Sequence, residues 1–184
     1  MEIIPTEIRD VRIIMPAKHW DRRGFLSETY NKKGLAEAGI ELDFVQDNHS
    51  YSSEKGVVRG LHYQAPPFAQ DKLLRVVRGS LFDVAVDLRK SSPTFGKYVG
   101  VILSAEKWNQ LLVPKGFAHG FATLEPGTEL VYKVTNYYRP EFDRGLFWRD
   151  PQVGIEWPVS FAEAIVSEKD SQLPRLSELK DLFD

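Results

Sequence analysis

The sequence contains no cysteine among its 184 residues. A chain without thiols cannot form disulfides, use a cysteine nucleophile or bind a metal through cysteine. Structural disulfides are typical of secreted proteins, so their exclusion is consistent with a cytoplasmic protein, and we expect this location.

Long apolar runs are also absent. The first seven residues already include Glu2 and Glu7, and no stretch approaches the roughly 20 apolar residues that a membrane-spanning helix needs. The sequence therefore predicts neither a signal peptide nor contact with a membrane.

An excess of one charge is missing as well. The chain has 24 Lys and Arg against 26 Asp and Glu, which gives a net charge of -2. This balance argues against nucleic acid or an anionic membrane as the main partner. Any phosphate group must therefore be bound at a local site.

Apolar and aromatic residues are plentiful, at 42% and 12% of the chain. That composition and length are enough to bury a sizeable core, and we expect one domain over residues 1–184. Segments rich in branched residues, punctuated by Gly and Pro, predict strands at 72–78, 80–88, 98–103, 110–113, 118–123 and 129–138.

Local signals refine this pattern. Gly79 suits a hairpin turn between the first two predicted strands, and Phe82, Val84, Val86 and Leu88 share one face of the second. We expect a short helix over 31–38 that ends at Gly39. An apolar stripe near the C-terminus is interpreted as packing; it consists of Leu173, Leu176, Leu179 and Leu182. The fold prediction is an antiparallel β-sandwich or jelly roll with a few short helices near the termini.

One stretch resembles the first motif of the cupin family with its metal ligands replaced. Gly56 and His62 keep the spacing of the motif's first glycine and histidine, while Lys72 and Gly79 keep the spacing of its last two positions. Gln64 stands where the second histidine would be, and Lys72 where the glutamate would be. A lysine ammonium has no lone pair for a metal, but it can bind an anionic group.

The second cupin motif is echoed further along the chain. Pro114, Gly116 and His119 keep its Pro-x-Gly-x-x-His core, Thr123 stands at the usual asparagine position, and no glycine lies six residues before Pro114. The two partial motifs, in order and separated by predicted strands, favour a cupin jelly roll.

The chain as a whole resembles the dTDP-4-dehydrorhamnose 3,5-epimerase family. The resemblance rests on segments spread over nearly the whole sequence, which are residues 23–25, 46–48, 59–64, 72–89, 92–96, 114–121, 132–140, 154–158 and 167–170. It implies a homodimeric jelly-roll cupin that uses neither a cofactor nor a metal. The implied substrate is a dTDP-4-keto-6-deoxyhexose, which is inverted at C3 and C5 by removal of protons beside the ketone.

The resemblance also implies the roles of the catalytic positions. His62 corresponds to the base, and an imidazole suits this role because it titrates near neutrality. Asp170 corresponds to the carboxylate that orients the base, and Tyr132 to the acid. Lys72 is expected beside the C4 oxygen, where its charge would stabilise an enolate. Taken alone, each residue has a structural alternative, such as a core histidine or an Asp that caps a helix.

The remaining positions are implied to bind the nucleotide or the sugar. They are Arg23, Glu28, Gln46, Asp47, Asn48, Arg59, Lys72, His119, Tyr138, Asp143 and Lys169. Packing is the alternative role for His119. Tyr138 corresponds to the ring that stacks on thymine, and the period of two along 129–138 predicts that it shares a wall with Tyr132. Some of the early positions can serve the site of a neighbouring subunit.

Three alternatives stay open at this point. Relatives that invert a single carbon keep the same His and Tyr, so the number of inverted centres is not fixed. His62 and His119 are compatible with a metal-dependent cupin oxygenase, although Gln64 and Lys72 argue against it. A binding protein for sugar nucleotides without catalysis is the third.

Overall fold

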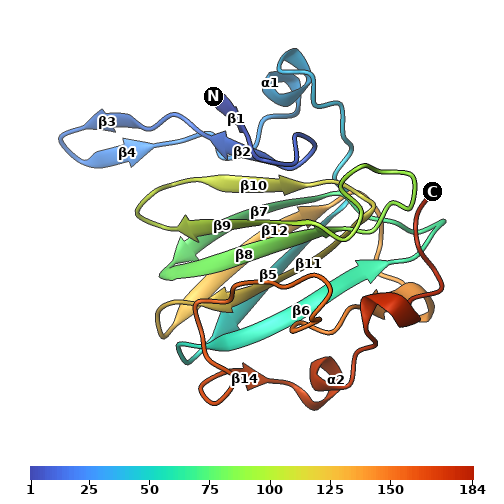
Figure 1. The fold of residues 1–184 in the computed structure, drawn as a ribbon. Coiled ribbons are helices and arrows are strands. Elements are labelled where there is room, and N and C mark those ends of the chain that lie inside the picture. The colour runs from blue at the N-terminus through green and yellow to red at the C-terminus, as the bar shows by residue number, and fades with distance from the viewer.

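Two six-stranded, mostly antiparallel sheets pack face to face in the computed structural model, which describes residues 1–184 (Figure 1). In spatial order the first sheet contains β1 (Glu2–Pro5), β2 (Arg12–Met15), β10 (Gln110–Val113), β7 (Lys72–Arg78), β12 (Thr128–Val134) and β5 (Gln46–Ser52). The second contains β13 (Asp143–Gly145), β6 (Val57–Gln64), β11 (Phe117–Thr123), β8 (Ser80–Asp87) and β9 (Tyr98–Ser104), with β14 (Ile165–Val166) pairing in parallel with β6. The predicted mainly β jelly-roll class is confirmed.

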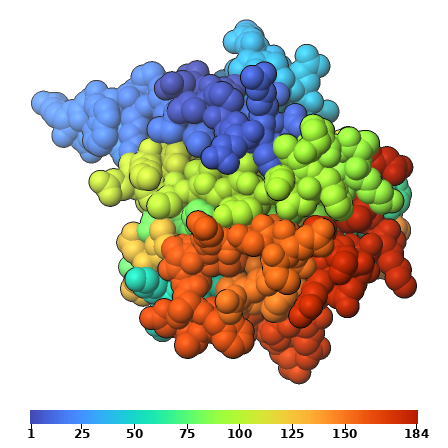
Figure 2. Space-filling model, in the orientation of Figure 1, coloured from blue at the N-terminus to red at the C-terminus, as the bar shows by residue number.

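The apolar residues of β8 show how both faces of the second sheet are buried. Leu81 and Ala85 point between the sheets and join the largest apolar cluster. Val84 and Val86 point to the opposite face, where Leu176 and Phe183 of the C-terminal segment cover them. The residues after β13 spread over this part of the molecule in orange and red (Figure 2). The shared face predicted for this strand is therefore confirmed, and it packs under the chain's C-terminal end.

The hairpin predicted at Gly79 is wrong. The strands on either side of it, β7 and β8, belong to different sheets and do not pair with each other. Gly79 has φ +75°, and a Cβ there would lie 2.6 Å from the Thr128 hydroxyl oxygen. The residue therefore allows a sharp turn against β12 that carries the chain from one sheet to the other. Strand periodicity predicted both strands correctly but does not encode which strands pair.

Helices are short and lie at the margins. Helix α1 (Lys32–Glu37) is capped by the Asn31 side chain, which accepts a hydrogen bond from Gly34 N, so the helix predicted there is confirmed. Its Leu35 packs on the outer face of the first sheet. The others are α2 (Glu168–Ser171) and the 3₁₀ turns η1 (Pro140–Phe142) and η2 (Leu176–Glu178). No helix has the length and apolar character needed to cross a bilayer.

The C-terminal leucine stripe packs as predicted. Leu176 is buried, and Leu179 and Leu182 pack against the same cluster on the second sheet. Leu173 lies over Gly145, where an added Cβ would come within 2.5 Å of its methyl groups. The segment is a chain of turns around η2 rather than a regular helix.

An arm formed by β3 (His19–Asp21) and β4 (Gly24–Leu26) extends away from the sandwich at the upper left of Figures 1 and 2. The arm meets the sandwich at Trp108, whose ring lies 4.8 Å from Phe25, centroid to centroid. The Lys18 ammonium lies 4.4 Å from the Trp108 ring centroid. These contacts hold the base of the arm, while its outer apolar side chains stay in solvent.

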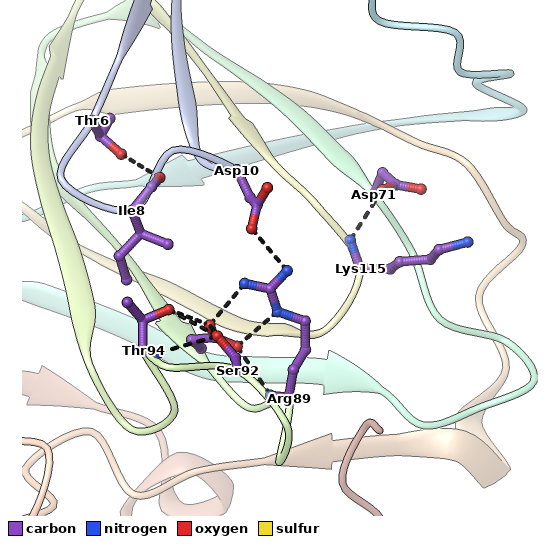
Figure 3. A network of polar contacts seen from close by, with 9 residues as sticks. Thr6, Ile8, Asp10, Asp71, Arg89, Ser92, Thr94 and Lys115 are labelled. Carbon is purple, nitrogen blue, oxygen red and sulfur yellow. Dashed lines mark hydrogen bonds and ion pairs between the residues drawn. The ribbon is translucent and has the colours of Figure 1, made fainter.

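A buried ion-pair network ties distant parts of the chain to the sandwich (Figure 3). Asp87 is fully buried and accepts hydrogen bonds from the Arg89 guanidinium and from the hydroxyls of Ser92 and Thr94. The same guanidinium reaches Asp10 near the N-terminus at 2.8 Å. Because a buried carboxylate is costly unless it is bonded, this network fixes the loop that follows β8.

Strand β6 contains a bulge that decides which of its side chains face the space between the sheets. Opposite β11, His62 pairs with His119 but Arg59 pairs with Phe121, so β6 holds one extra residue over this stretch. On a regular strand Arg59 and His62 would point to opposite faces, and the extra residue puts both on one side. Gly60 (φ +117°) and Gly120 permit this close crossing, because a Cβ on Gly120 would lie 2.6 Å from Arg59 O.

We predict that Gly120→Ala opens the bulge. The added methyl must push β6 away, which should lower the free energy of unfolding by about 1–3 kcal/mol, as for other overpacked sites, and displace His62. Denaturant unfolding measures the first effect. Gly34→Ala in α1 is the control, since its Cβ would meet atoms at 3.7 Å or beyond. This variant should raise the free energy of unfolding by about 0.5–1 kcal/mol, because alanine favours a helix over glycine. Equal stability of Gly120→Ala and the parent would contradict the account of the bulge.

Candidate active site

A cavity of about 640 Å³ lies between the two sheets. Side chains from β5, β7 and β12 of the first sheet, from β6, β11 and β13 of the second, and from α2 line it. The residues predicted as site residues that line it are Gln46, Asn48, Arg59, His62, Lys72, His119, Tyr132, Tyr138, Asp143, Lys169 and Asp170. The fold thus brings together residues separated by more than a hundred positions in the sequence.

His62 and Asp170 form a hydrogen-bonded pair in this cavity. Nε2 of His62 lies 2.7 Å from Asp170 Oδ1, and the other carboxylate oxygen accepts the backbone N–H of Gly60 at 2.9 Å. Because a carboxylate only accepts, Nε2 carries the proton, and Nδ1 remains as the basic nitrogen of a neutral ring. No protein group bonds Nδ1. This is the arrangement of an oriented general base.

The position of Asp170 follows from the start of α2. Ser167 caps the helix by accepting a hydrogen bond from Asp170 N at 3.1 Å, and β14 anchors the preceding residues to β6. Burial raises the pKa of Asp170, but hydrogen bonds from His62 and Gly60 outweigh that effect and hold the pKa below its ordinary value. The carboxylate is therefore ionised at neutral pH and can stabilise an imidazolium on His62.

Lys72 is the first residue of β7 in the first sheet, and its buried side chain reaches β6 of the second sheet. Its ammonium donates one long hydrogen bond, 3.4 Å, to the backbone carbonyl of His62. Burial lowers the pKa of Lys72 to about 8, while the charges of Asp83 and Asp143 act in the opposite direction. A cation with so few partners in an enclosed space is suited to binding a developing negative charge.

His119 is paired with Asp83, a residue that the sequence interpretation missed. Nε2 of His119 lies 2.9 and 3.0 Å from the two oxygens of Asp83, which is fully buried on β8. Burial lowers the pKa of His119, so the ring is neutral at pH 7. The alternation of β8 could have identified Asp83, since it falls between Leu81 and Ala85, which both face the space between the sheets. A carboxylate at such an inward position requires a partner.

Tyr132 faces His62 from the other sheet. It lies on β12 and packs against the main apolar cluster, and burial raises the pKa of its phenol, with Arg59 opposing the shift. The hydroxyl therefore keeps its proton at neutral pH. The predicted strand 129–138 is too long, because β12 ends at Val134. Tyr138 still lines the same cavity, but it does so from the following loop and not through strand periodicity.

Charged and polar groups cluster at the cavity rim. Asp143 Oδ2 accepts hydrogen bonds from Lys169 Nζ at 2.6 Å and from the Tyr138 hydroxyl at 3.2 Å. Gln46 holds the Tyr138 backbone N–H at 3.2 Å, and 51% of the Tyr138 residue stays exposed. Arg59 is braced by the carbonyl of Tyr51. The rim therefore offers two cations, Arg59 and Lys169, and the accessible ring of Tyr138 beside His62.

Three predicted binding residues lie outside this cavity. Asp47 alternates with Gln46 and Asn48 on β5, so it points to the outer face of the sheet and pairs with Lys133 at 2.9 Å. Glu28 lines a second depression on that same face. Arg23 sits at the tip of the arm, where its side chain is 84% exposed and pairs with Asp21. The structure of one chain does not bring these residues to His62.

Other lining residues were not predicted from the sequence. Ser50 follows Gln46 and Asn48 on the inward face of β5, so the period of two could have identified it. Gln70 also lines the cavity and donates to the Asn136 carbonyl at 2.7 Å, but no local pattern marks it.

The residues at the cupin ligand positions do not fit a metal. The Nε2 atoms of both histidines are bound to carboxylates, and the Gln64 amide bonds the backbone of Phe68, Tyr137 and Arg139. Lys72 occupies the remaining position as a donor. No group of three or more His, Asp or Glu side chains in the structure could hold a metal ion.

Comparison with known proteins identifies the same family as the sequence motifs. The family model described as dTDP-4-dehydrorhamnose 3,5-epimerase matches residues 5–178. A dTDP-4-dehydrorhamnose 3,5-epimerase of Shigella flexneri is 55% identical over 171 residues, which cover 92% of this chain and 93% of the relative.

Solved structures agree. The dTDP-6-deoxy-D-glucose-3,5-epimerase of Legionella pneumophila, in complex with dTDP-4-keto-L-rhamnose, superposes with a TM-score of 0.92 at 46% identity, over 97% of this chain and 94% of that one. A 3'-monoepimerase of Streptomyces bikiniensis, in complex with dTDP-quinovose, superposes with a TM-score of 0.87 at 32% identity, over 94% of this chain and 87% of that one. The chain belongs to the dTDP-4-dehydrorhamnose 3,5-epimerase family.

Proposed function

We propose that this chain converts dTDP-4-dehydro-6-deoxy-D-glucose into dTDP-4-dehydro-L-rhamnose by inverting C3 and C5. The whole chain, residues 1–184, acts as one epimerase domain in this proposal. A C–H bond beside a ketone is weakly acidic, because the carbanion delocalises onto oxygen as an enolate. Inversion requires a base on one face of the sugar and an acid on the other. The observation that carries the proposal is the placement of His62 and Tyr132 on opposite sheets around one cavity.

In this mechanism His62 Nδ1 removes the proton beside the C4 ketone. Asp170 is a positioning residue that keeps the proton on Nε2 and stabilises the imidazolium once it forms. The electron pair of the broken C–H bond moves into the enolate, with its charge on the C4 oxygen. The chemistry needs no cofactor, because both the electrons and the protons stay with the substrate, the protein and water.

Lys72 and Tyr132 complete the reaction. The Lys72 ammonium stabilises the C4 oxyanion, which is a contact that strengthens as the charge develops. Tyr132 then donates its proton to the carbon from the face opposite His62. A phenol that keeps its proton at neutral pH is suited to this step. Before the second carbon reacts, His62 releases its proton to water and Tyr132 regains one from water, and the same removal and return then follow at that carbon.

The rim residues bind the nucleotide. Arg59 and Lys169 supply positive charge for the diphosphate, and a guanidinium donates two parallel hydrogen bonds to such a group. Tyr138 offers its exposed ring for stacking on thymine. The neutral polar residues Gln46, Asn48 and His119, with Asp143, provide hydrogen bonds to the base and the sugar.

A homodimer is part of the proposal, because three apolar side chains of the arm are exposed to solvent in one chain. The residues Trp20, Phe25 and Leu26 are 68%, 42% and 74% exposed. Exposed apolar groups concentrated on one projection are typical of a protein interface. A second copy would cover them and would bring the arm's Arg23, together with Glu28, towards the partner's site.

The alternatives are weaker. A single-carbon epimerase uses the same base and acid, but the 3,5-epimerase of Legionella pneumophila is more similar to this chain than the monoepimerase, at 46% against 32% identity. A binding protein without catalysis would not need a base oriented by a buried carboxylate. A metal-dependent oxygenase does not fit the donor groups in the cavity.

The main test follows proton exchange in heavy water by NMR of the dTDP-4-keto sugar. We expect the parent enzyme to incorporate deuterium at C3 and C5, and His62→Ala to lose about 10²–10⁴-fold in rate at both carbons because general-base catalysis is worth that much. His49→Ala, on the outer face of β5, should exchange at the parent rate. No label from the parent enzyme would disprove the proposed function, and label at one carbon only would select the monoepimerase.

Tyr132→Phe separates exchange from inversion. His62 can still remove a proton and return deuterium to the same face, so exchange should fall little while inversion falls by about 10²-fold or more. Tyr98→Phe, which removes a phenol outside the cavity, serves as the control for the loss of a hydroxyl. An equal loss of exchange and inversion in Tyr132→Phe would exclude Tyr132 as the acid.

Leu26→Asp tests the arm interface. A charge placed on the most exposed apolar residue of the arm cannot be buried without a large penalty, so the variant should sediment as a monomer where the parent is a dimer. Ile102→Asp, on β9 outside the arm and 44% exposed, should leave the dimer intact. A parent chain that sediments as a monomer at micromolar concentration would contradict the dimer.

A further inference from the structure

Lys72 is a buried cation without a direct ionic partner. Its side chain makes a single long hydrogen bond, to a neutral carbonyl, and no salt bridge. A buried ammonium in such surroundings tends to lose its proton, because desolvation disfavours the charged form. An ammonium that has lost its proton cannot stabilise an oxyanion, so something in the structure must keep Lys72 charged.

Several titratable groups face Lys72 from the elements packed around it. They are His62 on β6, Asp83 on β8, His119 on β11, Tyr132 on β12 and Asp143 on β13. Strand β10, which pairs with β7 on the other side, carries no titratable residue over Gln110–Val113. Asp71 precedes Lys72 in the chain but bonds Lys115 N and the Thr135 hydroxyl. Only the two carboxylates Asp83 and Asp143 counter the effect of burial on the pKa of Lys72.

These two carboxylates differ in their own partners. Asp143 lies 2.6 Å from the ammonium of Lys169, so most of its charge is already balanced at the rim. Asp83 is fully buried and bonded only to the neutral ring of His119. The Asp83–His119 pair therefore keeps one net negative charge inside the sandwich, and Lys72 is the buried cation that can balance it.

We propose that Asp83 is a positioning residue for the epimerase reaction, which holds the Lys72 ammonium in its charged form and thereby sets the alkaline end of the pH range for activity. Asp83 does not line the cavity, so it acts on the substrate only through Lys72 and His119. This role rests on the proposed function, in which the charged Lys72 faces the C4 oxygen.

The two charges have complementary roles. A carboxylate in direct contact with the ammonium would neutralise the field that the oxyanion needs. Because it is bonded to the His119 ring and not to the ammonium, Asp83 raises the proton affinity of Lys72 without occupying its N–H groups. His119 also keeps a defined tautomer, because Nε2–H is committed to Asp83 and Nδ1 is left to accept a hydrogen bond.

The test is the pH dependence of kcat/KM for Asp83→Asn, since this parameter reports the ionisations of the free enzyme. Activity should fall as the pH rises through the pKa of Lys72, which is about 8 in the parent. Removal of a nearby negative charge makes the ammonium easier to deprotonate, so the alkaline limb should move down by about 1 pH unit.

Asp71→Asn is the matched control. It removes a carboxylate that is adjacent to Lys72 in the chain and also buried, but whose partners are Lys115 N (Figure 3) and the Thr135 hydroxyl. Its alkaline limb should coincide with that of the parent. Asp83→Ser provides a second variant without the carboxylate, in case the Asp83→Asn variant does not fold. Circular dichroism shows whether each variant is folded.

A folded Asp83 variant with an unmoved alkaline limb and a uniformly lower rate would overturn the proposal and leave Asp83 a structural role. If neither Asp83 variant folds, the same conclusion follows, because stability alone would then explain the residue. Lys72→Met separates this result from the proposed function. Loss of activity in Lys72→Met together with an unmoved limb in Asp83→Asn rejects only the role of Asp83, whereas full activity of Lys72→Met rejects the role of Lys72 itself.

Discussion

The contact on which the site depends is the double hydrogen bond of Asp170. One carboxylate oxygen holds the ring of His62, and the other holds the backbone of the bulge two residues earlier, at Gly60. The base and the strand that carries it are therefore fixed by the same group. Asp170 is itself fixed by the Ser167 cap and by the pairing of β14 with β6. Loss of the Asp170 carboxylate would free the ring to rotate, and loss of the ring would deprive a buried carboxylate of one of its two partners.

The sequence predicted much of the fold, because strands buried on both faces leave a strong pattern of branched residues. The strands at 72–78 and 110–113 coincide with β7 and β10. The pairing of β7 and β8 was wrong at Gly79, since the pattern of a strand is the same whichever neighbour it pairs with. The end of β12 was also wrong, because the residues after Val134 keep a strand-like composition while their backbone turns to form the cavity rim.

The site was predicted through motifs rather than through periodicity. His62, Lys72 and Asp170 were found by their family positions, and the structure brings them to one cavity. Asp83 was missed because no motif marked it, although its inward position on β8 required a partner. Arg23, Glu28 and Asp47 carried the same family signal but lie away from the cavity. A family position marks a residue by its place in the sequence, and that place does not determine which surface of the folded chain the side chain reaches.

The replaced ligands of the cupin motif explain how the same scaffold can support a different chemistry. A metal would bring two positive charges and would need its histidines as ligands, with their nitrogens unavailable as bases. In this chain one fixed charge comes from Lys72, Gln64 serves the backbone instead of the cavity, and His62 keeps Nδ1 free. In the proposed mechanism the cavity thus stabilises a negative oxygen and removes a proton with separate groups. Because neither group has to serve both purposes, the environment of each can be set independently, by Asp170 on one side and by the buried carboxylates around Lys72 on the other.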